Sequence, residues 1–161
     1  MLPEDTIYPP PAMATPSLPN IYQILGFEDI PDRIKSYPEE WQIVNLIRQG
    51  FSIVSIAKVA EYCDISEAEI ARLLATSERT ISRRKKDNRT LELSESDRLY
   101  RLARIFARTL EIFEDIRKAR EWLKQSNRAL AGATPLELLD TDMGAQKVDN
   151  LLNRIEYGFY S

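Results

Sequence analysis

The residues in this sequence best suited to chemistry are cations that lie close together, in SERTISRRKKDNR at positions 77–89. This stretch holds six of the 22 Lys and Arg residues, although the whole chain carries a net charge of −3. Residues 76–90 sum to +4, whereas residues 1–50 sum to −4. Clustered cations bind phosphates, and Arg also reads guanine edges in the major groove. The stretch therefore predicts contact with DNA; the alternative is a solvated charged helix face.

Residues that could support catalysis are scarce. The chain contains no histidine, which excludes His-based acid–base chemistry and His metal sites. The single cysteine, Cys63, has no histidine partner, and it follows an apolar helical pattern that indicates a small packing residue. None of the five glycines forms a Gly-rich phosphate loop. The sequence predicts a binding protein with no catalytic residues, metal, cofactor or small-molecule substrate.

The basic stretch belongs to a predicted helix-turn-helix unit in an all-α fold. Apolar residues recur at helical spacing and strand-like alternation is absent. Three short helices are expected, at about 52–63, 66–75 and 77–87, and Ile81 is the apolar anchor of the third. The N-terminus of that helix would present free N–H groups to a phosphate. The residues predicted to contact DNA are Ser77, Arg79, Thr80, Ser82, Arg83, Arg84, Lys86 and Arg89.

Capping signals locate the other helices. Ser66 with Glu69, and Thr134 with Glu137 behind Pro135, each form the Ser/Thr-x-x-Glu pattern of a helix start. A long helix is expected to begin at Ser94, and another helix is expected to end at Gly132. In the last predicted helix, four apolar residues are expected to face the core. These four are Val148, Leu151, Leu152 and Ile155.

Two patterns leave alternatives open. An apolar stripe fits either an intramolecular core seam or a dimer contact; its members are Leu99, Leu102, Phe106, Phe113, Ile116 and Leu123. A second basic run, Arg117 to Arg128, fits a solvated helix face or a contact with DNA flanks or an acidic partner.

Composition divides the chain into three parts. Residues 1–36 are expected to form a flexible, proline-rich segment, although NIYQILGF within them is apolar enough to dock on the folded body. Residues 37–92 form the predicted DNA-binding half, where Trp41, Val44 and Ile47 stand at helical spacing in a helix that stops at Gly50. Residues 93–161 form a second helical half. No apolar run predicts a membrane span or a signal peptide, and the lone cysteine fits a reducing cytoplasm.

Two longer stretches resemble the Xre/MbcA/ParS-type antitoxins, especially those of RES–Xre toxin–antitoxin modules. ARLLATSERTISRRKKDNRTLELSESDRLYRLARI resembles their helix-turn-helix with its TxxRR recognition helix. NRALAGATPLELLDTDMGAQKVDNLLNRIEYGFYS resembles their toxin-binding domain, with N-x-x-L-x-G-x-x-P-x-x-L-L and L-x-R-I-x-x-G. Together the two stretches cover about residues 50–161. One departure is that Ala75 and Thr76 stand where such turns often carry Gly and an apolar residue.

The resemblance implies a function in two parts. It implies a homodimeric bacterial antitoxin whose C-terminal domain covers the active site of a RES-type, NAD-degrading toxin. It also implies a helix-turn-helix that binds operator DNA and represses the shared operon. The residues expected to bind the toxin are Arg154, Tyr157, Gly158, Phe159, Tyr160 and Ser161, because aromatic side chains near a chain end are good anchors.

Other interpretations remain at this stage. The C-terminal residues could fold back on their own core instead of binding a partner. The whole chain could be a stand-alone helix-turn-helix repressor whose C-terminal helices only dimerise. An enzyme is the third interpretation, and the missing histidine argues against it.

Overall fold

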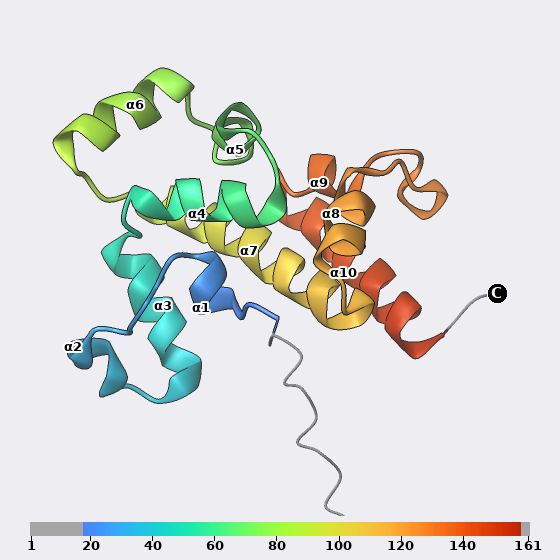
Figure 1. Cartoon of the computed structure of the whole chain (residues 1–161), viewed down its shortest axis with the longest axis horizontal. Coiled ribbons are helices and arrows are strands. Elements are labelled where there is room, and N and C mark those ends of the chain that lie inside the picture. The colour runs from blue at the N-terminus through green and yellow to red at the C-terminus, as the bar shows by residue number, and fades with distance from the viewer. Residues whose placement is uncertain (1–17, 159–161) are drawn as a thin grey trace, which may run out of the picture.

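The computed structural model describes residues 18–158, and this part of the chain is helical, with an isolated bridge between Ser52 and Thr90 and no strands. The all-α class is therefore confirmed (Figure 1). In chain order the elements are α1 (Ile21–Ile24), α2 (Asp32–Lys35), α3 (Glu39–Gln49), α4 (Val54–Cys63), α5 (Glu67–Leu73), α6 (Glu78–Asp87), α7 (Leu93–Phe113), α8 (Ile116–Lys124), the 3-10 helix η1 (Arg128–Leu130), α9 (Pro135–Leu138) and α10 (Asp142–Tyr157).

The central element is α7, a helix of 21 residues. Figure 1 shows it crossing the molecule, with α3 and α4 packed near its start and α8 and α10 near its end. The segment that leads into α1 lies against the second half of α7, between Arg104 and Glu111. Leu99, Leu102 and Phe106 of the apolar stripe are buried in the core, and so is Leu123 from α8. The interpretation of these residues as a core seam is confirmed. Both halves of the molecule are thus built on one helix.

The stripe does not continue along a single helix. α7 ends at Phe113, Glu114 adopts a left-handed φ of 54°, and the Asp115 side chain caps α8. Phe113 and Ile116 are half-buried. The Phe113 ring packs against Trp122 with its centroid 5.8 Å away. The chain therefore bends at a point where the sequence pattern is continuous.

The capping predictions are confirmed at two helix starts. Glu69 and Ser66 exchange hydrogen bonds of 3.2 Å in both directions, and Thr134 and Glu137 do the same at 2.8 and 3.1 Å. The helix predicted to start at Ser94 starts slightly earlier in the chain: α7 begins at Leu93, with Glu92 as its N-cap. Here the cap comes from the Glu95 carboxylate, which accepts the Glu92 N–H at 2.9 Å.

The helix predicted to end at Gly132 ends earlier. α8 stops at Lys124, and the following residues form the separate turn η1. The Asn127 side chain accepts the Ala129 N–H at 2.9 Å, which begins the 3-10 turn. Its main-chain oxygen also accepts the Gly132 N–H at 2.9 Å, so the loop closes on itself.

The N-terminal segment is more ordered than predicted. Ile24 and Leu25, at the end of α1, and Ile34 in α2 are completely buried, so residues 18–36 belong to the folded body. The predicted flexible segment cannot extend to residue 36, and the docking of NIYQILGF is confirmed. The prediction for residues 1–17 falls outside the described part of the chain. In α3, Leu46 is buried, but the side chain of Trp41 is not, although it has helical spacing.

Candidate functional site

The first candidate site is the helix-turn-helix formed by α5 and α6. The turn between them closes through hydrogen bonds from the Ala75 N–H to Arg72 O at 3.1 Å and from the Thr76 N–H to Ala71 O at 2.9 Å. Ala75 has a φ of 55°, where glycine would be unstrained and an alanine costs about 1 kcal/mol. The departure noted in the sequence therefore falls on the left-handed residue of the turn.

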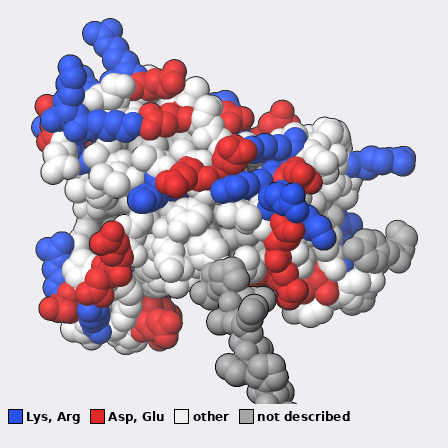
Figure 2. All heavy atoms as spheres, viewed as in Figure 1, with Lys and Arg blue, Asp and Glu red and all other residues white. Residues whose placement is uncertain are grey.

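The second helix of this unit, α6, projects from the body. Ile81 is its one buried residue, as the sequence predicted for the anchor. The predicted DNA-binding residues that are exposed are Ser77, Arg79, Ser82, Arg83, Lys86 and Arg89, and Thr80 is partly exposed. Ser77 also caps α6, since its hydroxyl oxygen accepts the Thr80 N–H at 3.1 Å. Figure 2 shows Lys and Arg side chains projecting from the end of the molecule where Figure 1 places α6.

Arg84 is the exception among the predicted DNA-binding residues. Its side chain is only 15% exposed, and its guanidinium donates to the carboxylate of Glu95, which is 9% exposed. Glu92 lies 4.0 Å from the same guanidinium. A buried charge is retained in a fold when it is paired in this way. The prediction that Arg84 faces DNA is therefore corrected: this residue joins α6 to α7.

Other polar contacts fix the orientation of α6. Lys85 forms an ion pair with Glu67 of α5. Arg98 of α7 donates to Leu74 O at 3.1 Å, which satisfies a carbonyl at the end of α5. Glu95 and Arg98 were not predicted as part of the site. The only signal in the sequence was a carboxylate and a cation separated by three residues at the start of a long helix.

Cations also surround a hollow at the C-terminal end of α6. The hollow has a volume of about 460 Å³. Its lining residues are Arg83, Arg84, Arg89, Thr90 and Glu92. Arg83 and Arg89 are exposed there, and the structure places no ion pair on either of them within residues 18–158. The two exposed guanidinium groups suit a phosphate group, which arginine binds through paired N–H donors.

The second candidate site lies at the other end of α7, on α10. Val148, Leu151 and Leu152 are buried as predicted, and Ile155 is half-buried against the core. Gly144 permits the close packing of α10 on the preceding turn, because a Cβ there would lie 2.0 Å from Leu138 O.

Polar contacts from three arginines of α7 also hold α10. Arg104 binds both carboxylate oxygens of Asp149 at 2.7 and 3.1 Å, and this hydrogen bonding raises the pKa of Arg104. Arg108 donates to Asn153 at 2.7 Å and to the carboxylate of Glu156. Arg101, the third arginine, lies 3.9 Å from Asp142. Packing and ion pairs therefore act along the whole length of α10.

In the last turn of α10 these contacts reach Glu156, but the structure gives Arg154 and Tyr157 no ion pair within residues 18–158. Arg154 is exposed, Tyr157 is 69% exposed, and Gly158 ends the helix with a left-handed φ of 67°. The alternative that the end of the chain folds back on its own core is therefore wrong for Tyr157. The other predicted toxin-binding residues, Phe159, Tyr160 and Ser161, lie outside the described residues.

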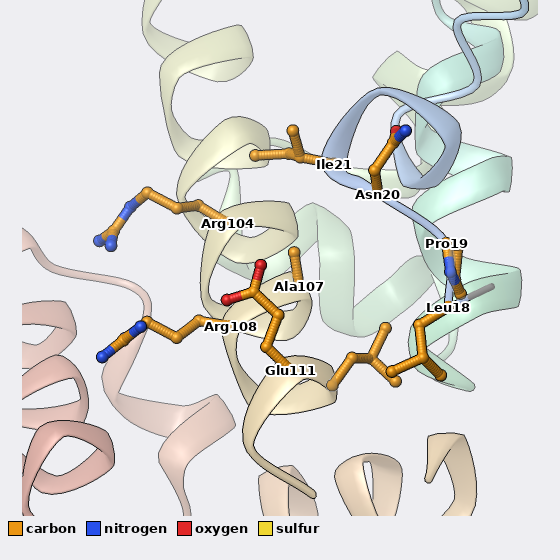
Figure 3. A pocket seen from close by; sticks show the side chains of 9 residues that line it. Leu18, Pro19, Asn20, Ile21, Arg104, Ala107, Arg108 and Glu111 are labelled. Atoms are coloured by element: carbon orange, nitrogen blue, oxygen red, sulfur yellow. The ribbon is translucent and has the colours of Figure 1, made fainter. Parts of the chain in front are cut away.

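A groove lies beside the second half of α7, between this helix and the N-terminal segment. Its volume is about 380 Å³, and it is formed by the N-terminal segment Leu18–Ile21 on one side and α7 on the other. Figure 3 shows Arg104 and Arg108 extending to the same side of α7, away from the N-terminal segment. Ala107 and Leu110 contribute apolar surface. A groove of this size can admit an apolar side chain of a partner, and the sequence did not predict it.

The second basic run does not form a solvated face throughout. Arg120 donates to Tyr62 O at 2.8 Å and to Glu61 O at 3.2 Å, and Lys124 contacts Asp64. These cations bind the last carbonyls of α4, where the helix dipole favours positive charge. The interpretation as a DNA or partner contact is therefore wrong for these two residues.

Cys63 lies in the core at the end of α4. It is completely buried, and its burial raises the pKa of its thiol, although Arg120 and Lys124 act in the opposite direction. A thiol in this environment stays protonated and is a poor nucleophile. The interpretation of Cys63 as a packing residue is confirmed.

Two protein-family models match this chain, one on each side of the middle of α7. A family model for the antitoxin Xre-like helix-turn-helix domain matches residues 42–104. A model for the antitoxin Xre/MbcA/ParS C-terminal toxin-binding domain matches residues 109–158. The two matches meet within α7, which supplies the last part of one domain and the first part of the other. Within residues 18–158, no helix combines the length and the apolar character that crossing a membrane requires.

Curated relatives agree with these matches. The chain is 31% identical over 117 residues to the Antitoxin Xre of Photorhabdus laumondii subsp. laumondii, covering 72% of this chain and 79% of the relative. It is 31% identical over 120 residues to the Antitoxin Xre of Yersinia enterocolitica, covering 74% and 81%. It is 29% identical over 131 residues to the Antitoxin Xre of Pseudomonas putida, covering 81% and 79%. The matched antitoxin domains and the antitoxin relatives indicate a non-enzymatic regulatory protein. The chain belongs to the Xre family of antitoxins and carries the helix-turn-helix and toxin-binding domains of a type II antitoxin.

Proposed function

We propose that this antitoxin neutralises a RES-type, NAD-degrading toxin through its C-terminal domain and represses their shared operon by binding operator DNA through α6. The observation that carries the proposal is the separation of two exposed surfaces. α6 and the tip of α10 lie in different matched domains, at opposite ends of α7, and share no residue. One chain can therefore present a cationic helix to DNA while its other end contacts a protein. The antitoxin acts as a homodimer in the bacterial cytoplasm.

The proposed DNA contacts come from the exposed side of α6. The helix N-terminus at Ser77 and the exposed cations bind phosphates, while short hydroxyls allow the helix to lie deep in a major groove. The proposed set excludes Arg84, which positions α6 through Glu95. It consists of Ser77, Arg79, Thr80, Ser82, Arg83, Lys86 and Arg89.

The proposed toxin contacts are the tip of α10 and the residues after it. Tyr157 is exposed next to Gly158, where the chain leaves the helix. A cavity that holds a dinucleotide offers apolar walls for the bases. Aromatic side chains from this tip would fill such a cavity and exclude NAD. The proposed set consists of Arg154, Tyr157, Gly158, Phe159, Tyr160 and Ser161.

Deletion of residues 159–161 tests the proposed inhibition. The deletion variant is produced together with the toxin encoded by the neighbouring gene, and cellular NAD is measured. We expect NAD to fall as it does with the toxin alone, because the residues that fill its pocket are missing. Binding of the variant to its promoter in a gel-shift titration should stay unchanged, which provides the internal control.

The same experiment distinguishes the proposed function from its alternatives. If the deletion variant protects NAD as well as the intact chain, the tip does not block the toxin and the helices of the C-terminal domain must do so. If even the intact chain fails to protect NAD while promoter binding persists, the protein acts on DNA alone, as a stand-alone repressor.

A further inference from the structure

Helix α3 has an apolar face that the core does not use. Ile43, Leu46 and Ile47 pack toward the core, and Leu46 is buried. On another side of the helix, Trp41 is 51% exposed, and Val44, one turn further on, is only partly buried. Tyr37, immediately before the helix, is also exposed. A single exposed apolar residue is ordinary, but several exposed apolar residues at the start of one helix are a feature of interaction surfaces.

Two charged residues flank this face. Glu40 precedes Trp41, and Arg48 follows Val44 by one turn; both are exposed. Neither takes part in an ion pair with any residue between 18 and 158, although eleven ion pairs connect other residues of that range. Residues 40, 41, 44 and 48 follow the three- and four-residue spacing that places side chains on one helix face. The face therefore has an acid at one end, a base at the other and apolar residues between them.

This order of charges complements a second copy of itself. When two α3 helices lie antiparallel with their Val44 residues opposite each other, Glu40 of each copy faces Arg48 of the other. Trp41 then lies beside the same arginine, where a guanidinium can stack on the indole ring. A parallel arrangement would place Glu40 against Glu40 and Arg48 against Arg48. A two-fold, self-complementary contact is the common form of a homodimer interface.

We propose that the antitoxin dimerises through this face of α3, defined by Glu40, Trp41, Val44 and Arg48. The proposal rests on the homodimer that is part of the proposed function, and it supplies the surface. It leaves α6 and the tip of α10 uncovered, so that DNA and toxin can bind the dimer. A helix of 11 residues is about 16 Å long and buries less than the roughly 1,200–2,000 Å² of a standard interface. The dimer should therefore dissociate at micromolar concentrations.

Sedimentation equilibrium over a concentration series of the full chain, without toxin or DNA, tests the proposal. We expect wild-type protein to pass from monomer to dimer. Arg48→Glu places two carboxylates opposite each other at both ends of the contact and should raise the dissociation constant about tenfold or more. The double variant Glu40→Arg, Arg48→Glu restores opposite charges and should restore the dimer. Met143→Glu, at a site on α10 that is 64% exposed, is the matched control and should leave dimerisation unchanged.

Each other outcome has a definite meaning. If Arg48→Glu dimerises like wild type, or if Arg48→Glu is monomeric and the double swap stays monomeric too, the α3 face is not the interface. In the first case the homodimer itself stands and uses another surface. If wild-type protein stays monomeric throughout the series, both this proposal and the homodimer are wrong. The roles proposed for α6 and α10 are unaffected in every case, because gel-shift and NAD measurements test them separately.

Discussion

The two functional ends of the molecule are held in place by different forces. α10 buries five residues along its length and adds ion pairs from three arginines of α7 to Asp142, Asp149 and Glu156. α6 buries Ile81 alone, and the largely buried pair of Arg84 with Glu95 provides its other internal anchor. The toxin-binding end is therefore an extension of the core, and the DNA-binding end is a cationic helix attached to it at a few points.

This difference follows from what each surface must present. A recognition helix has to expose several sides to enter a major groove, so few of its residues remain for packing. A buried ion pair can hold such a helix, because removing either partner leaves an uncompensated charge. A protein-binding tip needs only its last turn exposed, and the rest of α10 can pack. The position of α6 should thus depend on electrostatics, and that of α10 on hydrophobic burial.

The largest expected effect on stability comes from truncating the packed helix. Leu152 is completely buried, so Leu152→Ala should lower the free energy of unfolding by about 2–5 kcal/mol and weaken toxin neutralisation. Urea unfolding measures the first effect. Met143→Ala in the same helix, at an exposed site, should change stability by less than about 0.5 kcal/mol. If both variants unfolded at the same urea concentration, packing would not be what holds α10.

Breaking the ion pair of α6 should have the next largest effect. Arg84→Ala leaves the buried carboxylate of Glu95 without its cationic partner, which should cost roughly 3 kcal/mol and displace α6, so that operator binding falls at every salt concentration. A double variant, Arg84→Met with Glu95→Met, removes both charges and should be more stable than Arg84→Ala. These stabilities are read from urea unfolding, and operator binding from a salt titration. Unchanged stability combined with a smaller salt dependence would instead mean that Arg84 contacts phosphate, as the sequence alone predicted.

The smallest effect on stability should come from removing the exposed cations near Arg84. Arg83→Ala and Arg89→Ala remove side chains with no ion pair in the described part of the chain, so the free energy of unfolding should change by less than about 0.5 kcal/mol. Operator binding should become less sensitive to salt, because the slope of log K against log salt decreases in magnitude by about 0.9 for every phosphate left without its cation. A salt titration of operator binding measures this slope. An unchanged slope in both variants would remove this end of α6 from the DNA interface.

Much of the fold could be predicted from the sequence because its signals are local. Helical spacing placed Val148, Leu151 and Leu152 on one inward face, and the pattern of Thr134 and Glu137 located a helix start. The basic stretch and its apolar anchor Ile81 were also visible. Each of these features depends on residues within about four positions of one another, where the backbone geometry is fixed by the helix itself.

The sequence by itself therefore determined the all-helical class, the phase of its helices and the presence of a cationic recognition helix. Only the tertiary structure decided which cations are free: Arg84 meets Glu95, 11 residues away, and Arg120 meets Tyr62 O, 58 residues away. It also decided that Ile24 and Ile34 are buried while Trp41 is exposed. The physical reason is that a charge or an apolar side chain is neutralised or covered by whatever approaches it in space. Spacing along the chain specifies a face of a helix, but not what that face meets.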